Sequence, residues 1–539
     1  MSALTVAPKL TKLKVRLPRP RYDVSEIMEG VDAHFELQGF KLYRPYQFDG
    51  ISWMLDRELN AEGARGGILA DEPGLGKTIQ TAGVCFGNPV RRTLILVPPA
   101  VISQWEAVMT TIFGEENVYL HVGADRCATA EDLLIRTNTP DEWSYTIASH
   151  HMLLNYDDME KPTVLNEIAW DRVVMDECHV VRNKGTKLHK QACAIRAKYR
   201  WGLSGTPVQN KITDIVNLFK YLGVHAAGLK LDELIDQLIL RRTKAMVFKW
   251  NADLEMPELS VHNHVVPFEN DEERAFYHKI FKNAKNAFDV MADSESGVSA
   301  IAVLELLLRL RQASIHPQLV VRSYERKLNR KLKSMEHVFP TKMKAIVEHV
   351  EAHKELALVF CHFIDEMRMF EKYFEERGIG TRKYHGGMSI SERDDVISDF
   401  RETYTGSPRV LLIQIKAGGV GLNLQMFNQV YLSGPDWNPC NELQAIARAH
   451  RMGQERPVEF HRFILTDPAT PISADGAVFM TVDERINLIQ KEKRRLMATI
   501  LKDDSLLTTG KMTKKSLEKM MAYGRATELT SDDLASFFS

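Results

Sequence analysis

A short apolar run that leads into a glycine-rich loop is the feature that most restricts how this chain can fold. Gly66–Ala70 has the composition of a buried strand, and Thr78–Phe86 beyond the loop has that of a helix. A strand that passes through a loop into a helix is the start of a βαβ unit, and such units build parallel sheets. The sequence of the intervening loop is Asp71-Glu72-Pro73-Gly74-Leu75-Gly76-Lys77-Thr78.

The residues of this loop are suited to hold a triphosphate. Glycines let backbone N–H groups approach phosphate oxygens, and the N-terminus of the following helix favours anions. Lys77 is expected to reach the β- and γ-phosphates, and the hydroxyl of Thr78 is expected to bind Mg²⁺. Asp71 occupies the position that is usually the first glycine of G-x-x-x-x-G-K-T, so a chance glycine-rich turn is the alternative for the loop taken alone.

A pair of acidic residues follows another strand-like run. Arg172–Met175 leads into Asp176 and Glu177, so both carboxylates would lie at the carboxyl end of a strand, where ligands bind in open α/β sheets. Asp176 is suited to bind Mg²⁺, and Glu177 to polarise the attacking water. Acid pairs at strand ends are also common surface features, and only the combination with the loop points to one site.

Two arginines far downstream complete the predicted catalytic set. Glu442–Arg451 has the composition of a helix, and Arg448 and Arg451 are three residues apart, so they would share one helix face. Two such arginines usually face solvent or pair with acids. They become candidates for neutralising phosphoryl charge if a second lobe brings them to the loop, and hydrolysis would then depend on lobe closure.

Strand-like runs alternate with helix-like stretches in two separate regions, which predicts two α/β lobes with parallel sheets. The pattern fades after about Arg242, residues 270–335 are mostly helical in composition, and the pattern returns at Leu356–Phe360. The predicted parts are a basic, disordered tail at 1–30, lobe 1 at 31–245, a helical protrusion or linker at 246–335, lobe 2 at 336–500 and a helical extension at 501–539.

Composition narrows the class of protein without identifying it. The 539 residues carry a net charge of −1, which weakens an argument for nucleic acid from gross charge, although a neutral protein can still have a basic groove. The six cysteines contain no C-x-x-C pair, so the sequence predicts no zinc module and an intracellular protein with reduced thiols. No apolar stretch is long and uncharged enough to predict a membrane span.

The first 21 residues carry six basic side chains and no acidic one. A solvated disordered tail is the simplest interpretation. A nucleic-acid arm, a nuclear-import signal and a mitochondrial presequence are the alternatives.

Taken together, the motifs resemble the Swi/Snf-type ATPase family of the superfamily-two helicases over about residues 40–500. The segments most specific to that family are LSGTPVQN (203–210), ILRRTK (239–244), LRLRQASIHP (308–317) and WNPCNELQAIARAHRMGQ (437–454). The chain is most similar to the branch that holds RING-finger repair translocases and transcription-release ATPases. It lacks a RING, because residues 318–340 contain no cysteine, and ubiquitin-ligase activity is therefore not expected.

The resemblance implies two RecA-like lobes that use ATP and Mg²⁺, translocate on double-stranded DNA and displace DNA-bound proteins. By the same resemblance, Gln47 would read the adenine edge, since its amide both donates and accepts. Residues implied to grip nucleic acid and couple it to hydrolysis are His179, Ser204, Thr206, Lys416, Gly418, Gly419 and Gln444. Family habit and the basic N-terminus indicate a nuclear location, or the host nucleus or cytoplasm for a viral member.

Two other functions are compatible with the same motifs. One is a helicase that separates DNA or RNA strands, and the other is a clamp that binds ATP and nucleic acid without hydrolysis. The clamp is disfavoured because the complete catalytic set is present, namely Lys77, Asp176, Glu177, Arg448 and Arg451. The sequence does not reveal the oligomeric state.

Overall fold

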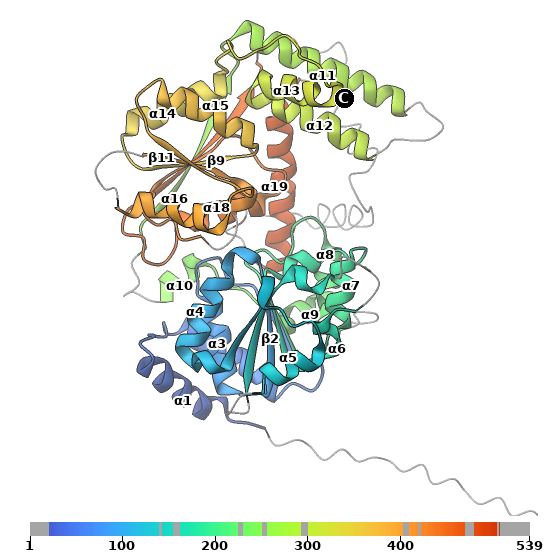
Figure 1. Cartoon of the computed structure of the whole chain (residues 1–539), viewed down its shortest axis with the longest axis vertical. Helices are drawn as coiled ribbons and strands as arrows, with labels where there is room; N and C mark the ends of the chain where they lie inside the picture. The colour runs from blue at the N-terminus through green and yellow to red at the C-terminus, as the bar shows by residue number, and fades with distance from the viewer. Residues whose placement is uncertain are drawn as a thin grey trace, which may run out of the picture.

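The computed structural model describes residues 21–138, 143–154, 162–224, 230–250, 256–292, 300–402, 409–418, 422–468, 479–503 and 506. It contains two α/β lobes, one above the other, with a group of helices beside the upper lobe (Figure 1). The predicted α/β class with two parallel-sheet lobes and helices between them in sequence is therefore confirmed. None of the helices within the described ranges is long and apolar enough to cross a membrane.

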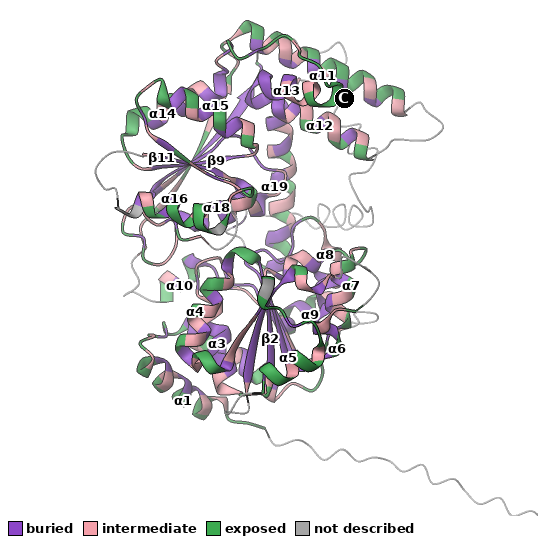
Figure 2. Ribbon diagram, viewed as in Figure 1, coloured by how far each residue is buried: buried purple, intermediate pink, exposed green. Residues whose placement is uncertain are grey.

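Lobe 1 is built on a seven-stranded parallel sheet in the order β3-β4-β2-β5-β6-β1-β7. Its strands are β1 (Gly66–Leu69), β2 (Arg92–Val97), β3 (Val118–His121), β4 (Ser144–Ser149), β5 (Ala169–Asp176), β6 (Arg196–Leu203) and β7 (Ile239–Leu240). Central strands are buried on both faces, as Figure 2 shows in purple, because helices cover each side. On β2, Leu94 and Leu96 enter one core and Ile95 and Val97 enter the other.

One face of this sheet is covered by α1 (Val24–Leu37), α2 (Tyr46–Leu59), α3 (Lys77–Gly87) and α4 (Ile102–Phe113). The predicted disordered tail at 1–30 is wrong for its last residues, because α1 begins at Val24. Met28, Val31 and Phe35 recur at helical spacing on α1 and are fully buried, so packing against lobe 1 orders this segment. Residues 1–20 lie outside the described ranges.

Lobe 2 is built on a six-stranded parallel sheet in the order β10-β11-β9-β12-β13-β8. Its strands are β8 (Leu259–Pro267), β9 (Ala357–Cys361), β10 (Thr381–Tyr384), β11 (Val410–Gln414), β12 (Gln429–Leu432) and β13 (Val458–Thr466). Helices α14 (Thr341–His353) and α15 (Ile364–Glu375) cover one face, and α16 (Ile390–Glu402) and α18 (Pro439–Ala449) cover the other.

The region predicted as a helical protrusion at 246–335 contains one element of a different kind. It includes α10 (Lys244–Trp250), α11 (Asp271–Ala292), α12 (Ala300–Ile315) and α13 (Pro317–Leu328), but also strand β8. β8 lies at the edge of the lobe-2 sheet, where it pairs with β13 over nine residues. Sequence inspection missed β8 because an edge strand is polar in composition and its partner lies far along the chain.

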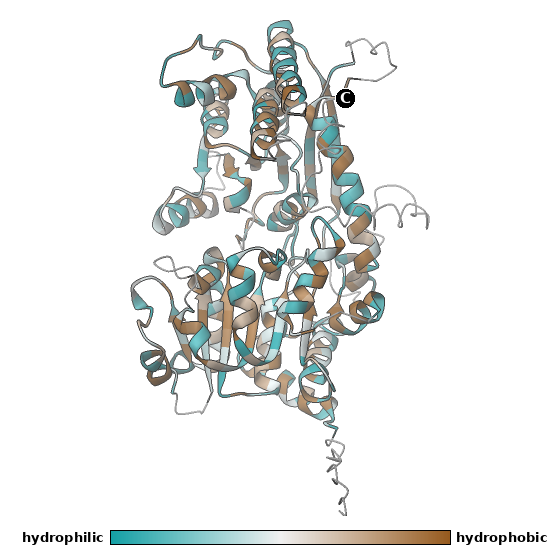
Figure 3. Cartoon of the chain, turned by 90° about the vertical axis from the view of Figure 1, so that its right-hand side faces the viewer, coloured by the Kyte–Doolittle hydropathy of each residue, from teal (hydrophilic) through white to brown (hydrophobic). Residues whose placement is uncertain are grey.

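A long helix, α19 (Val482–Leu501), connects both lobes, and Figures 1 and 3 show it running from the upper lobe to the lower one. Near its start, Ile486 packs with the helical protrusion, and near its end Ile500 packs into the core of lobe 1. Arg241 of lobe 1 forms an ion pair with Asp503 just beyond α19, with 2.9 Å between Nη2 and Oδ2. Of the predicted extension at 501–539, only Leu501–Asp503 and Leu506 lie within the described residues.

Candidate active site at the junction of the lobes

The candidate site lies at one edge of the lobe-1 sheet. Strands β1, β6 and β5 are adjacent and parallel, so the segments that follow them emerge at the same edge. β1 leads into the glycine-rich loop, β5 ends at Asp176, and β6 leads into Ser204. The loop contacts the segment after β6, because a Cβ atom on Gly205 would lie 2.6 Å from Cδ of Pro73. Three predicted motifs are therefore neighbours in space.

The glycines of the loop have backbone conformations that other residues rarely adopt. Gly74 and Gly76 have φ angles of +93° and +74°. A Cβ atom on Gly76 would also lie 2.4 Å from Nε2 of Gln47, so the loop closes against this amide. Oε1 of Gln47 accepts a hydrogen bond from the N–H of Tyr43 at 3.0 Å, which fixes the direction of the side chain.

Lys77 lies at the first turn of α3 and its ammonium group points back to the loop. Its Nζ donates to the carbonyl oxygen of Asp71 at 2.9 Å. Burial lowers the pKa of Lys77, while the nearby charges of Glu177 and Asp176 oppose that change. Thr78 is the second residue of α3, so its hydroxyl belongs to the same helix N-terminus.

The side chain of Asp71 has partners other than those predicted. It is fully buried, and its Oδ1 accepts a hydrogen bond from Nε of Arg242 at 2.9 Å. Oδ2 accepts another from Nε2 of Gln80 at 3.1 Å. The carboxylate thus forms an ion pair that holds the loop on lobe 1, and only the backbone of Asp71 faces Lys77. Glu72 accepts from the backbone N–H of Lys244, and Leu75 packs with Tyr46 and Val247.

Asp176 offers a carboxylate at the end of β5. Its Oδ2 accepts a hydrogen bond from Nε1 of Trp105 at 3.0 Å, and Oδ1 accepts one from the N–H of Glu177 at 2.9 Å. Burial, with the charge of Glu177, raises the pKa of Asp176 to about 6. A divalent cation favours the ionised form of a carboxylate, and oxygen donors such as Asp176 and Thr78 are those that Mg²⁺ prefers. These residues therefore fit Mg²⁺.

Glu177 is held by two polar neighbours. Oγ of Ser204 donates to its Oε2 at 3.1 Å, and Nδ1 of His179 lies 3.1 Å from the same oxygen. The N–H of Thr206 donates in turn to Oγ of Ser204 at 3.2 Å. Burial by itself would raise the pKa of Glu177, but its contact with His179 and nearby cationic groups lower it to about 2. Glu177 is therefore an anion in a fixed orientation at neutral pH.

The backbone of Glu177 is itself unusual, with a φ angle of +48°. Such a conformation is uncommon outside glycine and is often found where a side chain must be aimed at a reacting group.

Lobe 2 contributes two arginines, but they do not share a helix as predicted. α18 ends at Ala449, and His450 already has a non-helical backbone, so Arg451 follows the helix rather than lying on it. Arg448 is buried, and the charges of Glu177 and Asp176 act on it across the junction. Burial lowers the pKa of Arg448 to about 10, which leaves it protonated at neutral pH. Arg451 reaches the loop, because a Cβ atom on Gly74 would lie 3.2 Å from its own Cβ.

Two basic residues of the ILRRTK segment hold the site together, Lys244 between the lobes and Arg241 within lobe 1, although the sequence had suggested no individual role for either. Nζ of Lys244 donates to the carbonyl oxygen of His450 in lobe 2, and burial lowers the pKa of Lys244 to about 8. Nη1 of Arg241 donates to the carbonyl oxygens of Ala70 at 2.7 Å and Gly205 at 2.9 Å. The adjacent basic residues after a short apolar run were the available signal.

The remaining predicted residues do not contact the glycine-rich loop or the acidic pair in any contact described above. In lobe 2, Lys416 is exposed in α17 (Ile415–Gly418), Gly418 ends that helix, and Gly419 lies outside the described residues. Gln444 on α18 accepts a hydrogen bond from Nε of Arg448 through its backbone carbonyl oxygen, at 3.2 Å. A further contact across the junction joins Nδ2 of Asn438 to Oε1 of Gln209 at 3.0 Å.

Two models of known domain families match this chain. The model of an SNF2-related domain matches residues 46–229, and that of a helicase conserved C-terminal domain matches residues 341–453. The chain is 29% identical to a probable global transactivator of Orgyia pseudotsugata multicapsid polyhedrosis virus, with 78% of this chain and 86% of that protein covered. It is 27% identical to the putative ATP-dependent helicase/translocase YwqA of Bacillus subtilis, with 91% and 52% covered.

A third relative is the DNA repair protein RAD5B of Arabidopsis thaliana, at 26% identity with 82% of this chain and 46% of that protein covered. The chain thus spans about half the length of these two cellular relatives. A solved structure of the Sulfolobus solfataricus SWI2/SNF2 ATPase core in complex with dsDNA is 24% identical, with 87% and 97% covered. Its TM-score of 0.35 is too low to bear on how the lobes are arranged.

Proposed function

The chain belongs to the SNF2-related helicase-like ATPases, and we propose that it couples ATP hydrolysis to movement along double-stranded DNA. The observation that carries this proposal is the composite site, in which Arg448 of lobe 2 lies within the electrostatic reach of Glu177 and Asp176 of lobe 1. Hydrolysis at such a site depends on how the lobes meet. A ligand that changes the lobe arrangement can therefore control the rate, and each turnover can move one lobe relative to the other.

We assign the chemical roles as follows from the contacts described above. Bound MgATP supplies the phosphoryl group and the cation that neutralises it. Backbone N–H groups between Gly74 and Gly76 and the ammonium of Lys77 would hold its phosphates, while Thr78 and Asp176 would hold Mg²⁺. Gln47, fixed beside the loop, would contact the base.

In the hydrolytic step, one anionic and two cationic side chains would act. Ionised Glu177, oriented by Ser204 and His179, would align the attacking water. Arg448 and Arg451 would neutralise the charge that develops on the transferred group. The set is complete only when the lobes are together.

We propose that residues of both lobes couple ATP hydrolysis to DNA binding. His179, Ser204 and Thr206 form one hydrogen-bonded group around Glu177, so a shift in this group changes the orientation of the carboxylate. The proposed contacts with nucleic acid on the side of lobe 2 are made by Lys416, Gly418, Gly419 and Gln444. Contacts to phosphates carry no sequence information, so movement should not depend on base sequence.

The cellular role of the protein is proposed from its relatives. A transactivator and a DNA repair protein are among them, which supports displacement of DNA-bound proteins as the cellular task. A nuclear location is proposed with it.

The proposal is tested by steady-state ATPase assays with no nucleic acid, duplex DNA, single-stranded DNA and RNA. Duplex DNA is expected to stimulate turnover most, and Lys77→Ala and Glu177→Gln are expected to abolish it while the fold is retained. A triplex-displacement assay then measures movement. Stimulation by duplex DNA without displacement would contradict translocation.

The strand-separating helicase is the second candidate, and a strand-displacement assay distinguishes it. Translocation alone leaves the two strands paired. Stimulation mainly by single strands or RNA would favour the helicase. No turnover under any condition would favour the clamp.

A further inference from the structure

Five histidines gather on the face of lobe 2 that α14 covers. His262 and His264 lie on β8, His461 on β13, and His349 and His353 on α14. β8 and β13 are paired in register, with His262 opposite His461. Residues two apart on a strand share a face, and residues four apart on a helix do so as well. Three separate segments thus direct imidazoles to the same place.

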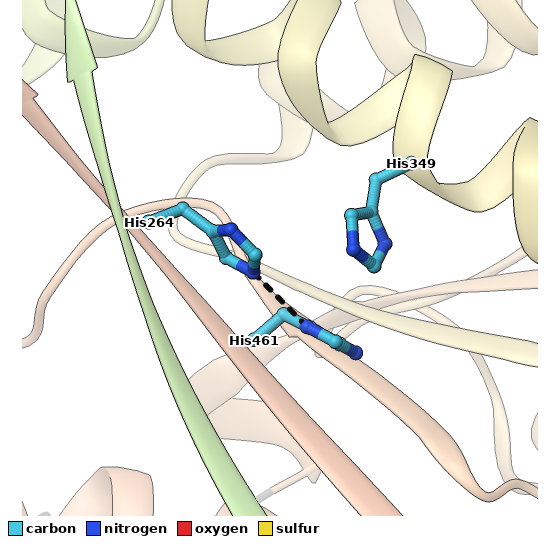
Figure 4. Close-up of side chains that lie close together, drawn as sticks. All are labelled: His264, His349 and His461. Atoms are coloured by element: carbon cyan, nitrogen blue, oxygen red, sulfur yellow. Dashed lines mark hydrogen bonds between the residues drawn. The ribbon is translucent and has the colours of Figure 1, made fainter.

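Three of these rings surround one point (Figure 4). Nε2 of His264 lies 3.1 Å from Nδ1 of His461. One ring nitrogen from each of His264, His349 and His461 lies within 4.8 Å of the other two. In tetrahedral zinc sites the Zn–N distance is about 2.0–2.1 Å, so two ligand nitrogens are about 3.4 Å apart. Only small ring movements would bring all three to that spacing.

Hydrogen bonds on the outer side of the cluster orient the rings. Nε2 of His461 lies 3.1 Å from Oε1 of Gln429, an oxygen that only accepts, so the proton is on Nε2 and the lone pair of Nδ1 faces the centre. The hydroxyl of Tyr431 donates to Gln429 at 3.4 Å and lies 3.1 Å from Nδ1 of His349. Nδ1 of His349 therefore donates to that hydroxyl, and its Nε2 keeps a lone pair. Such outer partners are characteristic of histidines that bind metal.

The contact between two of the rings also shows where one proton lies. Because Nδ1 of His461 carries a lone pair, Nε2 of His264 donates to it at 3.1 Å. Binding of a cation at this place would require the proton of His264 to move to its Nδ1, since a metal binds neutral imidazole through a free lone pair. The geometry of the three rings, not their titration, carries the inference.

We propose that His264, His349 and His461 form a binding site for a divalent transition-metal ion, of which Zn²⁺ is the simplest example. Three imidazoles with a water as fourth ligand match the preferences of this class. In the alternative group of His262, Glu459 and His461, the Glu459 carboxylate lies 3.4 Å from Nε2 of His461, and that nitrogen already donates to Gln429. The site is remote from the loop in sequence and independent of the proposed motor function.

Binding there would connect parts of lobe 2 that are distant in sequence. β8 is the strand that enters lobe 2, and α14 is the helix that returns from the helical protrusion. The ion would join both to β13 on the face of the sheet that α14 covers. The sequence predicted no zinc because only cysteines were considered, and this proposal stands against that expectation.

The test uses the full chain, freed of metal with a chelator and titrated with Zn²⁺ against a chromogenic competitor. Metal content is measured after gel filtration, and Co²⁺ provides a visible spectrum as an independent signal. One ion per chain is expected, together with an increase in the thermal unfolding temperature. His264→Gln is expected to weaken binding at least about 100-fold, and Gln429→Ala about 10- to 100-fold.

The matched control is His337→Gln, since His337 is exposed outside the cluster and contacts Glu272 at 3.0 Å. It is expected to bind Zn²⁺ as the natural sequence does. The proposal is overturned if binding does not saturate at one ion per chain. Equal affinity in the natural chain, His264→Gln and Gln429→Ala would overturn it as well. Because β8 is an edge strand, His264→Gln should fold, and Gln429→Ala tests the same site without removing a ligand.

Discussion

Asp176 and Glu177 are adjacent in sequence, but their surroundings move their acidities in opposite directions. The pKa of Asp176 is raised to about 6 by burial and by Glu177, whereas that of Glu177 is held at about 2 by its polar contacts. Carboxylates separated in this way are suited to different tasks. In the proposed mechanism, Asp176 would bind a cation and the ionised Glu177 would orient a water molecule.

This difference predicts a pH dependence of stability. Because the pKa of Asp176 is raised from 3.8 to about 6 on folding, its stabilising effect is present below pH 3.8 and is lost as pH rises to about 6. Between pH 4 and pH 7, Asp176→Asn should gain on the order of 2 kcal/mol of unfolding free energy relative to the natural chain. Urea unfolding without nucleotide or Mg²⁺ at several pH values measures it. A pH-independent difference would contradict the raised pKa.

A second residue-scale prediction concerns the arginines from lobe 2. Arg448→Ala should bind ATP with little change but hydrolyse it about a thousand-fold more slowly, because the guanidinium acts on the developing charge. Arg451→Ala is expected to behave in the same way. Nucleotide-binding and single-turnover assays separate the two steps. Arg368→Ala is the control, since Arg368 is exposed on α15 and pairs with nearby Asp365 at 3.0 Å. If the hydrolysis rate of a variant is unchanged, the arginine that it replaces does not act in hydrolysis.

At the scale of elements, α19 connects the two lobes by a buried ion pair at its end. The side chains of Arg241 and Asp503 are 8% and 4% exposed, and Arg241 also binds the carbonyl oxygens beside the loop and after β6. The end of α19 is thus one contact away from the candidate site. Neither residue could have been paired from the sequence, because 262 positions separate them.

Asp503→Asn should lower the unfolding free energy by about 2–4 kcal/mol, because it leaves the buried Arg241 without its counter-charge. The adjacent Lys502 offers a matched control. Its ion pair with Asp236 is more than half exposed on both sides, so Lys502→Ala should cost at most about 1 kcal/mol. Chemical unfolding of both variants measures the two changes in unfolding free energy. Equal losses would mean that burial of the ion pair does not determine its contribution.

At the scale of the whole molecule, the proposed function requires a chain with almost no net charge to bind a strongly charged polymer, DNA. With a net charge of −1, binding has to rely on local basic side chains such as the exposed Lys416. Duplex affinity is therefore expected to fall steeply with salt and to be the same for unrelated base sequences. Lys416→Ala should weaken binding uniformly and reduce the slope of log K against log salt by about 1. Fluorescence anisotropy at several salt concentrations measures this, and an unchanged slope would exclude Lys416 as a phosphate contact.

Local sequence determined much of the fold and many residues of the candidate site. The run through β1, the glycine loop and α3 carries its own strand, turn and helix signals within twenty-two residues of chain, Gly66–Gly87. The central strands of both sheets are continuous apolar runs, because both of their faces are buried. Asp176 follows the apolar run Val173–Met175, so its place at the carboxyl end of a strand could be inferred from the order of the residues alone.

Other features were decided only by contacts between distant segments. β8 is a strand because β13 pairs with it, and α1 is ordered because lobe 1 buries one of its faces. The helix before Arg451 ends earlier than its composition suggests, and the histidine cluster draws its three ligands from positions 264, 349 and 461. A local window records propensity and periodicity, whereas pairing, burial and electrostatic partners depend on what the rest of the chain brings near. For this protein, local sequence was enough for the motifs and the class of the lobes, whereas folding of the whole chain selects the side chains that meet.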